Sequence, residues 1–253
     1  YTLALQLPDT VDNGWLSAFA SGLSQDQEEF GLALLGGDTT RTPGPLTVTI
    51  NIIGEIVENN MILRSGAQVG NDVHVTGTIG DAAIGLALAT GAIRTENSSD
   101  AAALKARFLR PEPRLNVGPE LVGVASASAD VSDGLVADLG HICSASQTAA
   151  EIAQDLVPFS DATARLVTDN QPLRTGLLTG GDDYEIVFTA PETERDTVAA
   201  IATVTGVSIT RIGRINARAS DHGLVTVRDA AGNAVEAGDG GYRHFGGTRP
   251  SGE

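Results

Sequence analysis

The feature that most constrains this chain is a set of three acidic turns, each beside a short apolar segment. They are Gly36-Gly37-Asp38, Asp130-Val131-Ser132-Asp133 and Gly180-Gly181-Asp182-Asp183. Paired glycines let the backbone approach a ligand closely, and the exposed N–H groups of such turns suit phosphate oxygens. Aspartates beside them supply the hard oxygen ligands that Mg²⁺ prefers. Each turn alone is ordinary loop material, but the three together predict a site for a metal ion and a nucleotide.

The middle turn predicts a strand, a tight turn and a helix in succession. Small residues fill 126–129, and apolar residues recur at helical spacing over 135–143. Either Ser132 or Asp133 is predicted to cap the helix. Taken by itself, the motif fits a metal site and a plain helix cap with a solvated aspartate equally well.

Composition limits the classes of partner. The formal net charge of −16 over 253 residues argues against nucleic acid and anionic membranes, since both need a basic face. Cys143 is the only cysteine, which excludes an internal disulfide, and its place in an apolar helix predicts a core residue. No apolar run reaches the roughly 18 residues of a membrane span, and no leader pattern stands at the start, so a cytoplasmic protein is expected.

Strands and helices are predicted to alternate without regular βαβ order, which favours an α/β fold of the layered α+β kind over a doubly wound one. We place a domain boundary near residue 60, giving domains 1–60 and 61–253. His74, alone on a predicted strand, is interpreted as a core residue rather than a ligand. The predicted strands are 3–7, 32–35, 46–54, 73–77, 149–157, 186–189, 209–215 and 224–227. The predicted helices are 11–23, 81–89, 101–109, one after Pro113, 135–143, 161–167 and 193–204.

Several common enzyme motifs are absent. A P-loop needs a lysine after its glycines, and the single lysine, Lys105, has no such context. No Gly-x-Gly-x-x-Gly opens a helix after a strand, and neither a zinc-hydrolase motif nor a serine-nucleophile elbow occurs. The residues therefore indicate a site for a metal ion and a nucleotide more than any particular reaction.

Five motifs follow one another along the chain: Leu35–Arg41, Arg64–Ala67, Val75–Asp81, Asp130–Leu135 and Gly181–Glu185. They occur in the order found in the thiamine-monophosphate kinase family, which the chain resembles over nearly its whole length, and the closing segment Gly240–Phe245 is similar to the family's C-terminal end. The family belongs to the aminoimidazole-ribonucleotide-synthetase-like superfamily. The resemblance implies a two-domain fold with an incomplete N-terminal ATP-binding and dimerisation domain, a C-terminal α/β domain, and a homodimer formed through the N-terminal sheets.

The resemblance also implies an activity, namely ATP-dependent phosphorylation of thiamine monophosphate to thiamine diphosphate, assisted by several Mg²⁺ ions. Carried over by motif, Gly37, Asp38, Arg64 and Ser132 would bind ATP. Asp38, Asp130 and Asp133 would bind Mg²⁺. Glu185, Tyr242 and Phe245 would face the thiamine end, where a carboxylate and aromatic rings suit a cationic thiazolium. The Asp130 turn would then be the C-terminal domain's part of a Mg²⁺–nucleotide pocket.

The chain departs from the family at its start. It begins at Tyr1 inside a predicted strand, and the family's paired-aspartate metal motif has no counterpart. We expect the natural protein to contain that segment and expect weak or no activity without it. Three alternatives stay open: another superfamily enzyme, of the aminoimidazole ribonucleotide synthetase or selenophosphate synthetase type; a non-catalytic nucleotide-binding dimer module; and an acidic domain whose aspartates are all caps and turns.

Overall fold

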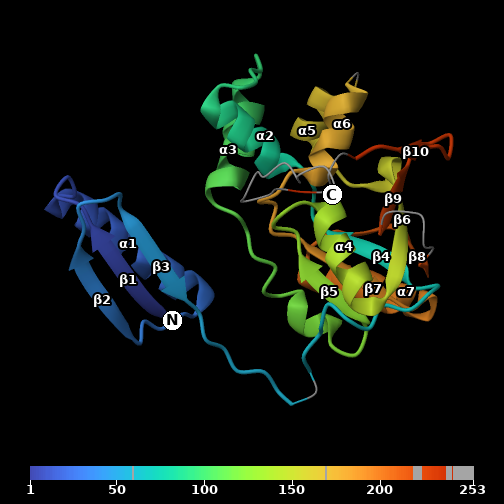
Figure 1. The fold of residues 1–253 in the computed structure, drawn as a ribbon, viewed down its shortest axis with the longest axis horizontal. Helices are drawn as coiled ribbons and strands as arrows, with labels where there is room; N and C mark the ends of the chain where they lie inside the picture. Colours follow the sequence, from blue (N-terminus) through green and yellow to red (C-terminus); the bar gives the residue numbers. More distant parts are fainter. Residues whose placement is uncertain (59, 169, 219–223, 238–240, 242–253) are drawn as a thin grey trace, which may run out of the picture. The chain divides into compact units, whose positions relative to one another are not determined.

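The computed structural model describes residues 1–58, 60–168, 170–218, 224–237 and 241. The chain divides into two compact units, Tyr1–Glu58 and Asn59–Glu253 (Figure 1). Each unit has its own β-sheet with helices packed beside it. The layered α/β fold predicted from the sequence is therefore confirmed.

The first unit is a three-stranded sheet with one long helix. Strand β1 is central, parallel to β2 and antiparallel to β3. Helix α1 begins after Asp12, whose carboxylate accepts the backbone N–H of Trp15 at 2.8 Å, and it ends at Gly31 with a left-handed φ of 64°. The elements are β1 (Thr2–Leu7), α1 (Asn13–Phe30), β2 (Gly36–Arg41) and β3 (Thr47–Asn51).

Of the strands predicted in this unit, one was misplaced and one was predicted too long. The apolar run 32–35 was expected to be a strand ending at the first acidic turn, but the strand is Gly36–Arg41 itself. Gly37 lies opposite Leu3, and a Cβ on Gly37 would lie only 1.8 Å from the Leu3 carbonyl oxygen. Glycine thus permits this tight pairing with β1. The predicted strand 46–54 is shortened to Thr47–Asn51, because β1 offers only Thr2–Gln6 as antiparallel partners.

The second unit is built on a seven-stranded mixed sheet in the order β10-β9-β6-β8-β4-β7-β5. Among the described strands of this sheet, only β6 and β9 pair in parallel. Its strands are β4 (Asp72–Thr76), β5 (Ala127–Asp130), β6 (Thr148–Ala153), β7 (Ile186–Ala190), β8 (Ile209–Ala217), β9 (Val225–Arg228) and β10 (Ala234–Val235). Its α-helices are α2 (Asp81–Thr90), α3 (Ser98–Leu109), α4 (Leu135–Ser146), α5 (Asp161–Val167), α6 (Gln171–Gly176) and α7 (Arg195–Thr205). Short 3₁₀ turns are η1 (Gly118–Leu121), η2 (Gln154–Leu156), η3 (Leu177–Thr179) and η4 (Glu192–Glu194).

Helices cover both faces of this sheet. Helix α4 buries Leu135, Leu139 and Cys143 against the face that carries Val187, which confirms Cys143 as a core residue. Helix α7 packs on the opposite face, which carries Phe188. Helices α2, α3 and α5 share a separate apolar cluster. No helix among the described residues combines the length and apolar character needed to cross a membrane.

Local corrections in this unit concern irregular segments. The helix expected after Pro113 is the single 3₁₀ turn η1, and the strand predicted over 149–157 ends at Ala153 before a second such turn. Helix α6 was not predicted, although Asn170 caps it and Pro172 stands in its first turn. Both residues are helix-start signals.

Candidate functional site

Three loops of the second unit meet at one edge of its sheet. The loop after β4 and the turn after β5 leave that edge, and the loop before β7 returns to it because β7 is antiparallel to both strands. Val131 donates its N–H to the Glu185 carbonyl oxygen at 2.8 Å, and Tyr184 donates to the Val131 carbonyl oxygen at 2.9 Å. The structure therefore brings the second and third acidic turns of the sequence together.

Glycines allow the two turns to come this close. A Cβ on Gly181 would lie 2.2 Å from the carbonyl oxygen of Ser132, which accepts the N–H of Asp182 at 2.9 Å. Gly134 has a φ of +119°, and a Cβ there would lie 2.7 Å from the backbone of Thr179. A side chain at either glycine would push the turns apart.

The carboxylate that stabilises the start of helix α4 belongs to Asp138. The N-cap is Gly134, which offers no side chain, so the prediction that Ser132 or Asp133 caps this helix was wrong. Asp138 is buried and accepts the backbone N–H groups of Ser132 and Asp133, both at 3.0 Å. Burial raises the pKa of Asp138, and these two N–H groups act in the opposite direction. The helix thus makes no use of the Ser132 and Asp133 side chains.

Asp130, Asp133 and Arg64 form the accessible part of this turn. Asp130 ends β5 and is exposed, while Asp133 is half-buried. Arg64 Nη2 lies 3.8 Å from Asp130 Oδ1, and about half of each side chain is in solvent, so their mutual attraction is weak. Two carboxylates beside a guanidinium suit a phosphate group and a cation that bridges it.

A further group of possible metal ligands lies one helical turn along α4. One ligand atom each from Asp133, Asp138 and His141 lies within 4.8 Å of the others. Asp138 is already bound by two N–H groups, and the imidazole of His141 suits transition metals better than Mg²⁺. The donor set that fits Mg²⁺ is the carboxylate pair Asp130 and Asp133, because that ion uses few carboxylates and keeps waters and phosphate oxygens as its other ligands.

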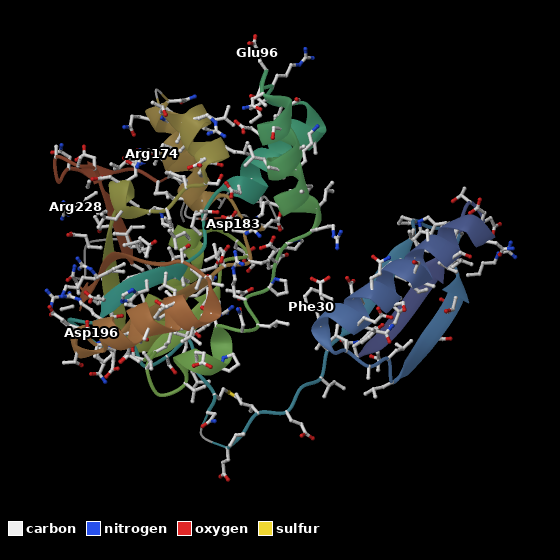
Figure 2. The ribbon with its side chains drawn as sticks, turned by 180° about the vertical axis from the view of Figure 1, so that it is seen from behind. Phe30, Glu96, Arg174, Asp183, Asp196 and Arg228 are labelled. Carbon is white, nitrogen blue, oxygen red and sulfur yellow. The ribbon has the colours of Figure 1, made fainter. Side chains whose placement is uncertain are left out.

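Asp183, from the third turn, lies inside the second unit (Figure 2). Its carboxylate accepts the N–H groups of Gly80 at 2.7 Å and Ala82 at 3.2 Å, at the start of α2. Burial raises the pKa of Asp183 to about 7; the two N–H groups lower it, while the nearby Asp81 and Glu185 raise it further. Asp183 therefore anchors its loop to α2 and does not face a ligand.

Glu185 is also buried, with none of its side chain in solvent. It accepts hydrogen bonds from Thr76 Oγ1 at 2.7 Å, Arg114 Nε at 2.6 Å and Arg107 Nη2 at 3.0 Å. A Cβ on Gly77 would lie 2.1 Å from Glu185 Oε1, so the carboxylate fills the space that a side chain there would need. Glu185, which was predicted to face the thiamine end, thus directs its carboxylate to these buried partners.

The loop instead presents the residues on either side of Asp183. Asp182 and Tyr184 have left-handed φ values of 69° and 51°, which non-glycine residues rarely adopt, and Tyr184 is 40% exposed. Burial raises the pKa of Tyr184, and the Asp182 and Asp130 carboxylates raise it further. Such strain is common at functional sites. The run of two acids at 182–183 was a sequence signal that could have singled out Asp182.

The first acidic turn lies in the first unit. Asp38 is exposed, and its carboxylate accepts the N–H of Thr39 at 2.8 Å. Gly37 lies in the β2 ladder described above, which fixes the backbone beside Asp38. These two residues thus sit on a strand rather than after one.

The predicted aromatic residues Tyr242 and Phe245 lie outside the described residues. Gly241 is described, and a Cβ on it would lie 2.5 Å from the Ala137 side chain and 2.9 Å from the Asp133 carbonyl oxygen. Gly241, the residue before Tyr242, therefore lies next to the Asp130–Asp133 turn.

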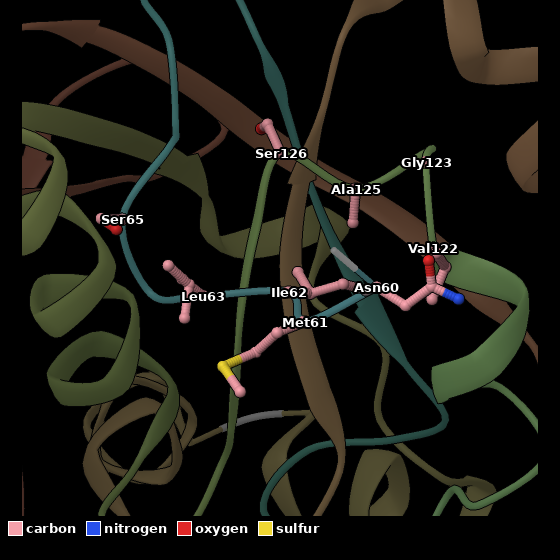
Figure 3. Close-up of a pocket in the computed structure, with 9 residues that line it drawn as sticks. All are labelled: Asn60, Met61, Ile62, Leu63, Ser65, Val122, Gly123, Ala125 and Ser126. Atoms are coloured by element: carbon pink, nitrogen blue, oxygen red, sulfur yellow. The ribbon is translucent and has the colours of Figure 1, made fainter. Parts of the chain in front are cut away.

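A groove on the same unit lies beside segment 60–65, which also carries Arg64 (Figure 3). None of its lining residues is charged, so the groove offers no ion pair to a phosphate group. It is lined by Asn60, Met61, Ile62, Leu63, Ser65, Val122, Gly123, Ala125 and Ser126.

Comparison with known proteins shows the family of the chain. Residues 1–56 match the family described as AIR synthase related protein, N-terminal domain, and residues 68–225 match its C-terminal domain. Thiamine-monophosphate kinase of Escherichia coli K12 is 43% identical over 244 residues, covering 96% of this chain and 73% of that protein. The chain belongs to the thiamine-monophosphate kinase family.

Solved structures agree with this membership. The thiamine-monophosphate kinase of Stenotrophomonas maltophilia K279a superposes with a TM-score of 0.81 at 39% identity, covering 92% of this chain and 72% of that one. The structure of AaThiL complexed with AMPPCP and TMP gives 0.74 at 27% identity, covering 96% and 72%. The hydrogenase maturation protein HypE, at 16% identity and a TM-score of 0.67, shares the fold alone. The thiamine-monophosphate kinase fold is thus present over both units.

Proposed function

We propose that this protein transfers the γ-phosphoryl group of ATP to the phosphate of thiamine monophosphate and so forms thiamine diphosphate. The observation that carries the proposal is the Asp130–Asp133 turn, which is exposed at Asp130 and held against the Asp182 loop, in a member of the thiamine-monophosphate kinase family. An acceptor phosphate oxygen attacks the γ-phosphorus and ADP leaves. This reaction needs positioning and neutralisation of charge, and it needs no covalent nucleophile.

The Asp130 turn is the proposed nucleotide and metal site of the second unit. Asp130 and Asp133 would hold Mg²⁺, while Ser132 and Arg64 would contact the nucleotide phosphates. When bound, Mg²⁺ supplies a positive charge that neutralises the transferred phosphoryl group. Arg64 adds a second positive charge, and the weak pairing with Asp130 leaves its guanidinium able to turn toward an anion.

In the first unit we propose that Gly37 and Asp38 have a similar role. The exposed Asp38 carboxylate would bind Mg²⁺, and the backbone at Gly37 would approach the nucleotide phosphates. Pairing with β1 fixes that backbone before any ligand binds, which reduces the entropy lost on binding.

For the thiamine end we propose Asp182 in place of the buried Glu185. The cationic thiazolium suits the carboxylate of Asp182, next to the half-exposed ring of Tyr184. Tyr242, and with it Phe245, would enclose the rings of the substrate. The passage of the chain beside Asp133 at Gly241 supports this role for Tyr242.

We also propose a cytoplasmic homodimer formed through the sheets of the first unit. Val48 and Ile50 share one face of β3 and are 40% and 46% exposed, and the buried hydrophobic residues of this unit are Tyr1 and Leu5. An exposed apolar strand face gains stability when a partner covers it.

Direct assay tests the proposed activity. The complete protein with ATP, Mg²⁺ and thiamine monophosphate should form thiamine diphosphate and ADP in equal amounts, and chelation of Mg²⁺ should abolish both products. No thiamine diphosphate under these conditions would contradict the proposal. Mg-ATP binding without turnover would favour the non-catalytic module, and turnover only with aminoimidazole or selenium substrates would favour another superfamily enzyme.

A further inference from the structure

Two clusters, each built on one fully buried acid and two arginines, lie at opposite ends of β4. The arginines around Glu185 are mostly buried, whereas those around Asp72 are about half in solvent. The Glu185 cluster consists of Glu185, Thr76, Arg107 and Arg114, and it lies at the end of the strand. The Asp72 cluster consists of Asp72, Arg195 and Arg211, and it lies at the start. Both acid side chains are fully excluded from solvent. The strand separates them by roughly 13 Å, at about 3.3 Å per residue.

The Glu185 cluster is connected to the loop that the proposed function assigns to the substrate. Side chains of this loop alternate: Asp183 and Glu185 point inward and are buried, while Asp182 and Tyr184 lie nearer solvent. The Glu185 carbonyl oxygen accepts the N–H of Val131, which ties the loop to the metal-binding turn as well. The strained backbone at Asp182 and Tyr184 persists only if these inward anchors hold it.

The arginines reach Glu185 from a different part of the chain. Arg107 lies on α3 and Arg114 on the segment after it, and their side chains are only 18% and 15% exposed. Arg114 binds both carboxylate oxygens, a fork-like geometry that fixes orientation as well as charge. The carboxylate therefore cannot move without moving or uncovering two guanidinium groups.

We propose that Arg107 and Arg114 are positioning residues for thiamine monophosphate. Acting through Glu185, they hold Asp182 and Tyr184 in the orientation that receives the substrate. The inference rests on the proposed function, and in it Glu185, Arg107 and Arg114 act through the loop without touching the reacting atoms. Loss of the cluster should weaken binding of thiamine monophosphate far more than binding of ATP.

The Asp72 cluster supplies a matched control. Asp72→Asn and Glu185→Gln each neutralise a fully buried acid that pairs with two arginines, so both should lower the melting temperature. Only Glu185→Gln should raise the KM for thiamine monophosphate, by about tenfold or more, with the KM for ATP within about threefold of wild type. If Glu185→Gln fails to fold, the neutral pair Glu185→Gln with Arg114→Gln carries the same test, because it leaves fewer unpaired buried charges.

A second readout does not depend on turnover. Amide hydrogen exchange at Asp182 and Tyr184 should quicken in the Glu185 variant and stay unchanged in the Asp72 variant. Equal KM values for thiamine monophosphate in the two variants would overturn the inference. If wild type forms no thiamine diphosphate, the proposed function fails, and the exchange rates alone then decide whether the cluster holds the loop.

Discussion

At the start of β4, Asp72 accepts two hydrogen bonds from Arg195 and lies 3.5 Å from Arg211; at its end, Glu185 is bound by two other arginines. Both acids are fully buried and each pairs with two arginines, but the arginines around Asp72 are about half in solvent while those around Glu185 are mostly buried. The surroundings also differ. The Asp72 cluster lies beside the solvated start of helix α7, whereas the Glu185 cluster lies next to two acidic loops, one of which has strained backbone at Asp182 and Tyr184. A buried ion pair therefore marks a functional site only through what it holds in place.

The largest expected difference between the two ends of β4 is in catalytic activity. Replacing both Asp130 and Asp133 with Asn should reduce kcat/KM by about 10³-fold, because the charge that holds the cation and the phosphates is removed. Asp72→Asn, at the far end, should leave kcat/KM within about twofold of wild type once the protein is folded. Steady-state assays at saturating Mg²⁺ measure both. Equal losses in the two variants would mean that the Asp130 turn has no special role.

The two glycines that flank β4 allow the stability of its two ends to be compared. Gly77 and Gly70 both have positive φ, 54° and 95°, but only at Gly77 would a Cβ collide with the buried carboxylate of Glu185. Gly77→Ala should lower the free energy of unfolding by about 3 kcal/mol, from backbone strain and steric overlap together. Gly70→Ala should lower it by about 1 kcal/mol, from strain alone. Urea unfolding separates the two, and similar losses would show that the carboxylate of Glu185 can shift without effect.

Titratable groups near the two ends of β4 should change the free energy of unfolding in opposite directions as the pH falls. Burial lowers the pKa of His74, two residues from Asp72, to about 4; Asp72 raises it, while Arg211 and Arg195 lower it. As the pH falls, His74 therefore takes up a proton in the unfolded chain before it does so in the folded chain. The stability that neutral His74 contributes is lost as the pH falls from 6.5 toward 4. The pKa of Asp183 is raised to about 7, so the folded chain takes up a proton first and stability rises as pH falls from 7 toward 3.8.

In the wild type these two slopes offset each other between pH 4 and 6.5, each reaching at most about 1.4 kcal/mol per pH unit. His74→Phe, which preserves the stack on Phe188, should leave a protein whose stability rises on acidification. Asp183→Asn should leave one whose stability falls. Urea midpoints at several pH values give both slopes. Slopes of the same sign in the two variants would contradict the assigned titrations.

Sequence reasoning succeeded where structure is set by neighbouring residues. The strand, turn and helix over 127–146 follow from local periodicity, and the Asp130 motif was recognised within them. It failed where distant segments decide. The partners of Glu185 lie 71 and 78 residues away, and only the folded register shows that its carboxylate points inward. Likewise, β2 is defined by its pairing with β1, which no local apolar pattern signals.

The alternation along residues 182–185 has a consequence for how this family changes over time. The inward residues Asp183 and Glu185 fix the backbone, so the side chains of the outward residues Asp182 and Tyr184 carry less of the packing. Substitutions at the two outward positions can therefore accumulate without unfolding the protein. A combinatorial library at 182 and 184 is the natural starting point for evolving this scaffold toward phosphate acceptors of different shape and charge.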